Sequence, residues 1–241
     1  MRGLLRRLAD LFLNGFGGRE GRRYESVLPG ATYAPWNLDD EFLKCYQKIK
    51  QYTLVDKYRC FELWRLVEQT AKLEGGLLEV GVWRGGTGAL IARRAQLAQI
   101  QAPIYLCDTF SGVVKSGVKD SMYRDGEHAN TGKMWVEKLV QNEFNLPNVH
   151  ILAGVFPDET GAGLSEQEFR FCHIDVDVYQ SAIDILEWVW PRLVPGGVVV
   201  YDDYGFPYCD GITRHVDEQI GRSDALIVHN LNGHALMIKR D

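Results

Sequence analysis

Four aspartates follow two apolar runs in the C-terminal half of the chain. Asp175 and Asp177 lie in HIDVDVYQS, and Asp202 and Asp203 lie in VVVYDDYG. Carboxylates this close together repel one another, and burial raises their pKa values further unless a positive charge intervenes. A divalent cation supplies that charge, and ligands that are all oxygens select magnesium, manganese or calcium over zinc. The pattern therefore indicates a site for a hard divalent cation.

Each pair of aspartates also has an ordinary structural interpretation. Asp175 and Asp177 can cap the helix expected from YQSAIDILEWVW, and the other pair can simply begin a loop. If the first segment is extended, its two acids point to the same side. Asp202 and Asp203 are adjacent, so they converge only if their strand ends before Tyr204. The occurrence of both pairs at the ends of two expected strands favours the cation site.

A glycine-rich turn in EVGVWRGGTGALIA suggests a second binding element. Gly85 and Gly86 permit a close approach of the backbone to a ligand or, alternatively, serve only to build a tight turn. The order of glycines differs from the G-x-G-x-x-G of dinucleotide enzymes. Glu79 favours a ligand with a positive amine, and Asp108 can accept both hydroxyls of a ribose. Together these ligand features describe S-adenosylmethionine.

The elements that must position these residues begin at Gly75, where short apolar runs alternate with longer amphipathic ones. Such alternation predicts an α/β fold, with a parallel sheet covered by helices on both faces. DALIVHN and HALMIKR, joined by the turn LNG, add an antiparallel end and make seven strands in all. Ligands of such sheets bind outside the carboxyl ends of the strands, where the acids and glycines fall. We expect the first five strands at 76–81, 103–108, 148–154, 170–175 and 197–202, and helices near 87–100, 131–145, 179–194 and 211–221.

The residues before this pattern form two further parts. Residues 1–23 are expected to form an amphipathic arm and a flexible connector, and residues 24–74 a helical lead-in before the catalytic domain at 75–241. Within the lead-in, one helix is expected at 39–51, capped by Asp39 or Asn37, and another at 56–73.

Charge, cysteines and hydropathy exclude several classes of function. The net charge of -5 argues against nucleic-acid binding, and no apolar run reaches the roughly 18 residues needed for stable insertion in a membrane. The five cysteines lack CxxC spacing and are typical of free thiols in a reducing cytoplasm. The N-terminal arm favours docking or self-association, so we expect a cytoplasmic homo-oligomer.

Five motifs follow one another along the chain: EVGVWRGGTG, CDTFSG, LAGVFPDET, HIDVDVYQS and PGGVVVYDDYGFPYCDG. Together they resemble the motifs of the TylF/MycF family of macrocin-type, metal-dependent sugar O-methyltransferases. The similarity runs from about Tyr52 to the C-terminus. It implies a class I S-adenosylmethionine-dependent methyltransferase (Rossmann-like) fold, S-adenosylmethionine as methyl donor, and a divalent metal, usually Mg²⁺.

The resemblance also implies roles for individual residues. The metal-binding aspartates would be Asp175, Asp202 and Asp203, and Asp177 would be the general base beside Asp175 in the catalytic site. Val176 stands where similar enzymes commonly have a glycine, and we expect it to narrow the space near the acceptor. The expected donor-site residues, which combine the argument from Glu79 with the matched positions, are Glu79, Gly81, Gly85, Gly86, Thr87 and Asp108.

The polar, glycine-bearing segment 111–132 is long for a loop and suggests a lid or binding element. His128 within this segment is an alternative general base, whereas His173 is interpreted as a satisfied core residue. Aromatic faces pack against sugar rings, so an acceptor pocket lined by aromatic residues is one interpretation and structural packing the other. The aromatic residues in question are Tyr33, Trp36 and Tyr52.

The leading interpretation is a metal-dependent O-methyltransferase that acts on a hydroxyl of a sugar, polyol or glycosylated small molecule. A catechol-like phenol acceptor is the alternative within the same chemistry, because paired hydroxyls of either kind chelate magnesium. A nucleotide-dependent oxidoreductase and a non-catalytic binding protein are the alternatives from other classes. The glycine order disfavours the first of these, and the four retained acids disfavour the second.

Overall fold

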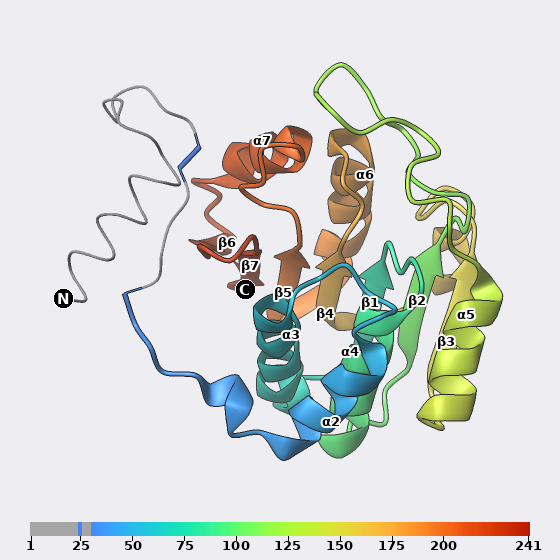
Figure 1. Cartoon of the computed structure of the whole chain (residues 1–241). Helices are drawn as coiled ribbons and strands as arrows, with labels where there is room; N and C mark the ends of the chain where they lie inside the picture. Colours follow the sequence, from blue (N-terminus) through green and yellow to red (C-terminus); the bar gives the residue numbers. More distant parts are fainter. Residues whose placement is uncertain (1–23, 26–29) are drawn as a thin grey trace.

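The apolar runs of the sequence form a seven-stranded sheet in the computed structural model, which describes residues 24–25 and 30–241 (Figure 1). Strands β1 to β5 run parallel, and β7 pairs antiparallel with both β5 and β6. The order across the sheet is β3-β2-β1-β4-β5-β7-β6, which confirms the predicted α/β class and its antiparallel end. The strands are β1 Gly76–Val80, β2 Ile104–Asp108, β3 Val149–Ala153, β4 Phe169–Ile174, β5 Leu193–Tyr201, β6 Ala225–His229 and β7 Ala235–Lys239.

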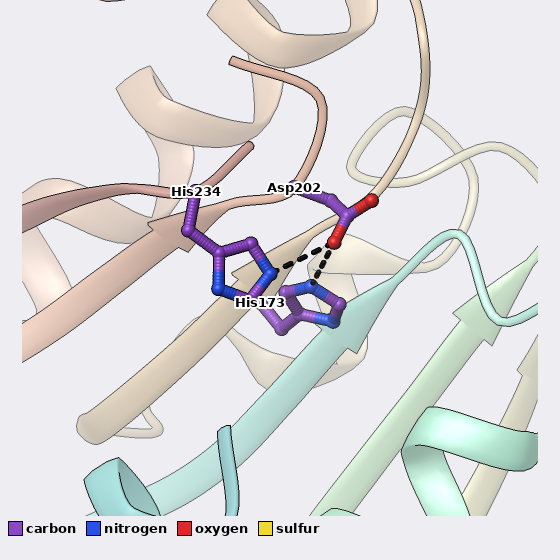
Figure 2. Close-up of side chains that lie close together, drawn as sticks. All are labelled: His173, Asp202 and His234. Carbon is purple, nitrogen blue, oxygen red and sulfur yellow. Dashed lines mark hydrogen bonds and ion pairs between the residues drawn. The ribbon is translucent and has the colours of Figure 1, made fainter. Parts of the chain in front are cut away.

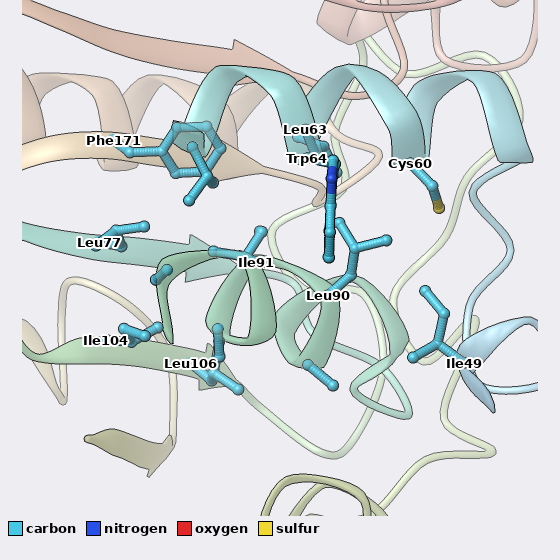
Figure 3. Close-up of a cluster of buried hydrophobic side chains, with 14 of the residues drawn as sticks. Ile49, Cys60, Leu63, Trp64, Leu77, Leu90, Ile91, Ile104, Leu106 and Phe171 are labelled. Atoms are coloured by element: carbon cyan, nitrogen blue, oxygen red, sulfur yellow. The ribbon is translucent and has the colours of Figure 1, made fainter. Parts of the chain in front are cut away.

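Helices cover both faces of the sheet, as near-continuous apolar strands require. On one face, α2, α3, α4 and α5 pack over side chains such as Leu77, Leu106 and Phe171 (Figure 3). On the other face, α6 and α7 pack over side chains such as Leu78 and Cys172. The helices are α2 Asp40–Ile49, α3 Lys57–Gln69, α4 Gly86–Leu97, α5 Lys133–Glu137, α6 Tyr179–Val189 and α7 Asp210–Gln219.

The lead-in helices begin where their caps predict. The carboxylate of Asp39 accepts a 2.9 Å hydrogen bond from the amide of Phe42, and Asp56 accepts one of 2.7 Å from the amide of Tyr58. Each cap satisfies an amide that would otherwise lack a partner in the first helical turn. Two predicted helices change character near their ends: residues 70–72 form a 3₁₀ turn, and α5 continues as a π-helix over Lys138–Glu143.

Four further expectations concern the N-terminal arm, membrane-spanning helices, the cysteines and the division of the chain into parts. The amphipathic arm and connector, residues 1–23, lie outside the described residues. Within the described ranges, no helix combines the length and apolar character that a membrane crossing needs. All five cysteines are free and buried, as their spacing indicated. The division at residue 74 stays a prediction, since α2 and α3 share one hydrophobic cluster with α4.

Candidate active site

A cavity opens at the carboxyl ends of β1 to β5, on the edge of the sheet where the sequence predicted it. Residues that directly follow all five of these strands line it, because parallel strands bring their carboxyl ends to the same edge. The lead-in contributes Arg59 and residues 53–55, and the long loop after β2 contributes Tyr123 and His128. The predicted residues that line this cavity are Gly81, Thr87, Asp108, Asp175, Asp177, Asp202 and Asp203.

Three of the aspartates meet in this cavity. Carboxylate oxygens of Asp175, Asp202 and Asp203, one from each, all lie within 4.8 Å of one another. Burial, together with repulsion from Asp202 and other acids, raises the pKa values of Asp175 and Asp203 well above the usual range. The Oδ2 atom of Asp203 is buried and has no hydrogen-bond partner within the described part of the chain.

Asp202 differs from its two neighbours because positive groups surround it. Arg59 pairs with its Oδ2 atom, and the Nε2 atom of His234 lies 2.8 Å from its Oδ1 atom. Burial alone would raise the pKa of this carboxyl, but contacts with His173, His234 and Arg59 hold it below the usual range. Asp202 therefore remains ionised beside two acids that resist ionisation.

The segment that holds Asp175 and Asp177 is not extended throughout. The two acids would point to one side in an extended segment, but β4 ends at Ile174 and Asp177 has a φ of 65°. A tight turn, in which Val178 donates a 2.7 Å bond to the carbonyl of Val176, replaces the extended chain. Asp177 consequently groups with Asp203 and Cys209, still in the same cavity.

The surroundings of Asp177 include His128, which the sequence singled out, and Tyr123, which it did not. Burial raises the pKa of Asp177 to about 6, whereas the nearby His128 and a hydrogen bond from Tyr123 each lower this pKa. The Nε2 atom of His128 in turn lies 3.2 Å from the hydroxyl of Tyr123. The loop 111–132 therefore reaches the acidic cluster, as expected of a binding element.

Glu79 does not line the cavity, contrary to expectation. Its side chain is fully buried, and its Oε1 atom lies 2.8 Å from the Nδ1 atom of His173. Leu77 and Glu79 are two residues apart in β1, so their side chains lie on the same face of the sheet, which α4 covers. The carboxylate of Glu79 therefore points into the packed layer between β1 and α4. His173 is buried as predicted, but its Nε2 atom has no hydrogen-bond partner among the described residues.

The glycine turn has a packing role as well as an expected donor role. A Cβ at Gly81 would lie 1.6 Å from the carbonyl oxygen of Asp175, and one at Gly86 would lie 2.7 Å from the backbone of Tyr52. Gly85 has a φ of 88° and packs against Val136. Gly85 and Gly86 are absent from the cavity lining, so these two glycines instead let the turn dock on its neighbours.

Asp108 holds the turn after β1 in place. Its Oδ2 atom accepts 2.7 Å hydrogen bonds from the amides of Val82 and Trp83, and its Oδ1 atom accepts one of 2.6 Å from Phe110. Burial raises the pKa of this carboxyl, whereas these three backbone amides act in the opposite direction. The side chain still reaches the cavity, and about one of its four lone-pair sites, on Oδ1, is left by these three bonds.

Of the two interpretations given for Tyr33, Trp36 and Tyr52, the structure favours packing for Trp36 and Tyr52, and none of the three lines the cavity. Trp36 packs edge-on against Tyr58, Tyr52 packs near Trp135, and Tyr33 is 72% exposed. The aromatic side chains that line the cavity come instead from the loops after β1, β2, β3 and β5. They are Trp83, Tyr123, Phe156 and Tyr208.

Comparison with known proteins identifies the family. The model of the TylF family, described as macrocin-O-methyltransferase, matches residues 47–227. The chain is 31% identical over 188 residues to 8-demethyl-8-(2,3-dimethoxy-alpha-L-rhamnosyl)-tetracenomycin-C 4'-O-methyltransferase of Streptomyces olivaceus, covering 73% of this chain and 71% of that one. It is 27% identical over 191 residues to mycinamicin III 3''-O-methyltransferase of Micromonospora griseorubida, covering 73% and 74% respectively.

Solved structures agree at the level of the fold. The O-methyltransferase NovP superposes with a TM-score of 0.69 at 22% identity, covering 79% of this chain and 83% of that one. An O-methyltransferase from Bacillus cereus, solved in complex with SAH, superposes with a TM-score of 0.55 at 17% identity, covering 84% and 91%. Membership of a methyltransferase family sets aside the oxidoreductase and the non-catalytic interpretations. The chain therefore belongs to the TylF family of macrocin-type O-methyltransferases and is an S-adenosylmethionine-dependent enzyme with the class I fold.

Proposed function

We propose that this enzyme methylates a hydroxyl of a sugar or of a glycosylated small molecule, with the help of a divalent cation. One observation carries the proposal: Asp175, Asp202 and Asp203 converge in the same cavity that Gly81, Thr87 and Asp108 line. The relatives named above, which act on a rhamnosyl compound and on mycinamicin III, support a sugar-bearing acceptor.

The donor atoms of the three aspartates fit a hard divalent cation. All are carboxylates, the ligand type that Mg²⁺ and Mn²⁺ prefer. The partnerless Oδ2 atom of Asp203 supports a cation here. The raised pKa values of Asp175 and Asp203 support it too, because ionising these acids would leave negative charge that the described residues do not compensate. Asp202 is already bonded to Arg59 and His234, but a carboxylate has about four lone-pair sites and retains capacity.

The cavity also fits the donor. Asp108 is the carboxylate at the end of β2, where class I enzymes present an acid to ribose hydroxyls. Gly81 has a φ of 88° and admits close approach at the end of β1, and Thr87 lies in the first turn of α4. We propose Gly81, Thr87 and Asp108 as donor contacts. Glu79, Gly85 and Gly86 support them by packing.

Asp177 is the proposed general base. Its pKa of about 6 leaves it ionised at neutral pH, yet basic enough to accept a proton. A bound divalent cation would supply the positive charge that lowers the pKa of an acceptor hydroxyl. The proton of that hydroxyl would pass to a carboxylate oxygen of Asp177, while Tyr123 holds this side chain by a hydrogen bond. His128, which contacts Tyr123, is the alternative base.

Two further properties complete the proposal. Five buried free thiols suit a reducing compartment, so we propose that the enzyme works in the cytoplasm. The amphipathic pattern of residues 1–12 supports self-association of the chain.

A direct experiment measures transfer of a labelled methyl group from S-adenosylmethionine to a panel of sugars, glycosides and catechols. The enzyme is first treated with a chelator and then assayed with and without added Mg²⁺. We expect transfer to diol-bearing sugars only when the cation is present. Transfer to catechols but to no sugar would mean that the acceptor is a catechol-like phenol. Full activity after chelation would overturn the role of the cation.

Substitutions separate the cation from the donor. Asp203→Asn should abolish the response to Mg²⁺ and leave the dissociation constant of S-adenosylmethionine unchanged, because that residue faces the acidic cluster. Asp158→Asn is a matched control, since Asp158 is an exposed acid paired with Lys115 and lies outside the cavity lining. A normal Mg²⁺ response in Asp203→Asn would contradict the assignment.

A further inference from the structure

Two buried histidines aim their rings at one oxygen of Asp202. His173 lies in β4, Asp202 directly follows β5, and His234 directly precedes β7 (Figure 2). The Nε2 atoms of His234 and His173 lie 2.8 and 3.7 Å from the Oδ1 atom of Asp202. Both imidazoles are completely buried, and Asp202 is 2% exposed. The three donor atoms all lie within 4.8 Å of one another.

A glutamate anchors each of these rings from its opposite side. The Nδ1 atom of His173 lies 2.8 Å from Glu79, and the Nδ1 atom of His234 lies 2.7 Å from Glu62. Metal-binding histidines carry the same arrangement, in which a carboxylate fixes one ring nitrogen and leaves the other free to bind. Asn232 also donates a 2.9 Å hydrogen bond to Glu62, so that this carboxylate is itself held in place.

The Nε2 atom of His173 is the observation that points to a ligand. It is buried and has no hydrogen-bond partner among the residues that the structure describes. At 3.7 Å, its distance to Asp202 is too long for a hydrogen bond. When two ligand atoms bind the same ion, each at roughly 2.0–2.2 Å from it, they lie about this far from each other.

We propose that His173, His234 and Asp202 form a second metal site, distinct from the cluster of oxygen ligands but sharing Asp202 with it. Two imidazoles and one carboxylate select ions of intermediate softness, such as Zn²⁺, Fe²⁺ or Co²⁺, whereas the three aspartates favour Mg²⁺. Asp202 lines the cavity, so an ion can reach the site from there.

The surroundings of the site favour a bound cation. Glu62, Glu79 and Asp202 face the two imidazoles, and Arg59, which pairs with Asp202, is shared with Asp56. Buried negative charge requires compensation. Two extra protons on the histidines are the competing solution, and they give a buried ion-pair network without any metal.

The test uses the full chain, treated with a chelator and then titrated with Co²⁺ as a spectroscopic probe. We expect about one equivalent of Co²⁺ to produce visible absorption bands, and Zn²⁺ to displace it. X-ray absorption of the Zn²⁺-loaded wild-type protein should reveal two imidazole ligands. This count does not depend on any variant, and a shell of oxygens without imidazole would overturn the site.

Variants then separate the two metal sites. His173→Gln and His234→Gln should eliminate the Co²⁺ bands, and Glu62→Gln should weaken Co²⁺ binding by about 10- to 100-fold. Asp175→Asn should retain the bands, because Asp175 belongs only to the oxygen cluster. Bands that persist in both histidine variants, or that vanish only in Asp175→Asn, would contradict the proposal. The Co²⁺ bands report metal binding and not methyl transfer with Mg²⁺, so this inference and the proposed function can fail separately.

Discussion

The guanidinium of Arg59 on α3 forms a buried ion pair with the carboxylate of Asp202, although 143 residues separate them in the sequence. The same guanidinium bonds through its Nε atom, at 2.8 Å, to Asp56 at the start of its own helix. The pair therefore fixes the lead-in to the acidic cluster beyond β5. Because both partners are buried, removing one leaves a charge without compensation.

Arg59→Gln should lower the free energy of unfolding by about 3–5 kcal/mol, the usual effect of breaking a buried ion pair from one side. Urea denaturation of the metal-free protein measures this loss. Arg65→Gln, on the same helix, is the control, because Arg65 is 52% exposed and pairs with Glu68 at the surface. Its effect should stay within about 0.5 kcal/mol. Equal losses in the two variants would show that the buried pair has no special role.

The sequence predicted the fold and the oxygen cluster because both depend on local patterns. Alternating apolar runs determine the strand type, and the carboxyl ends of neighbouring parallel strands must share an edge. Asp175, Asp202 and Asp203 each follow their strand within a residue or two, which places them on one edge of the sheet, and they converge there because β4 and β5 are neighbours.

The remainder of the site depends on contacts that no local pattern encodes. Glu79 meets His173 because β1 and β4 are neighbours with these two residues in register, and the order of strands is not visible in the sequence. Arg59 and His234 approach Asp202 from α3 and from the turn before β7, for the same reason. The left-handed conformation of Asp177 was unforeseen, since acids adopt it only occasionally.

Gly86→Ala should destabilise the protein and weaken donor binding, since the added Cβ would lie 2.7 Å from both Tyr52 and Thr53. The amide of Gly86 also donates a 2.9 Å hydrogen bond to the carbonyl of Tyr52, so the turn has no room to shift. Thermal unfolding and calorimetric titration with S-adenosylhomocysteine measure the two effects. Gly163→Ala is the control, because nothing lies within 4 Å of its added Cβ. Unaltered melting and donor affinity in Gly86→Ala would contradict the packing argument.

Asp177→Asn should lower kcat by about 10²- to 10⁴-fold, the range for loss of a general base. Asparagine tolerates the left-handed backbone, so the substitution removes the charge without straining the turn. Donor affinity should stay at the wild-type value. Asp125→Asn, an exposed acid of the same loop as Tyr123, should leave kcat unchanged. If the variant retains kcat, His128 becomes the base to test.

The stability of the metal-free protein should depend on pH through Asp177. Its folded pKa of about 6 exceeds the usual value of 3.8, so the folded state binds more protons between these pH values. Stability from this group is therefore present at low pH and lost as pH rises through 6. His215, whose pKa burial lowers to about 4, acts in the opposite direction, so the measurement must be differential.

That comparison uses melting temperatures of wild type and Asp177→Asn at several pH values. Relative to wild type, the variant should gain stability as pH rises from about 4 to about 6, the window between the two pKa values. Added Mg²⁺ should reduce the gain, because a cation near the cluster compensates the charge. A constant difference across this range would show that Asp177 titrates normally.

Tyr123→Phe should shift the acidic limb of the rate profile upward. The hydrogen bond from Tyr123 favours the ionised form of Asp177, so its loss raises the pKa of this carboxyl above about 6. Since the base acts only when ionised, kcat at low pH should fall while kcat on the alkaline plateau changes less. A pH profile of kcat measures the midpoint of the limb. Tyr33→Phe, whose ring is 72% exposed, is the control and should leave the midpoint in place. A midpoint that moves to lower pH in Tyr123→Phe would mean that the hydroxyl stabilises the protonated form of Asp177. That result would contradict the role of Tyr123 in keeping Asp177 ionised as the base.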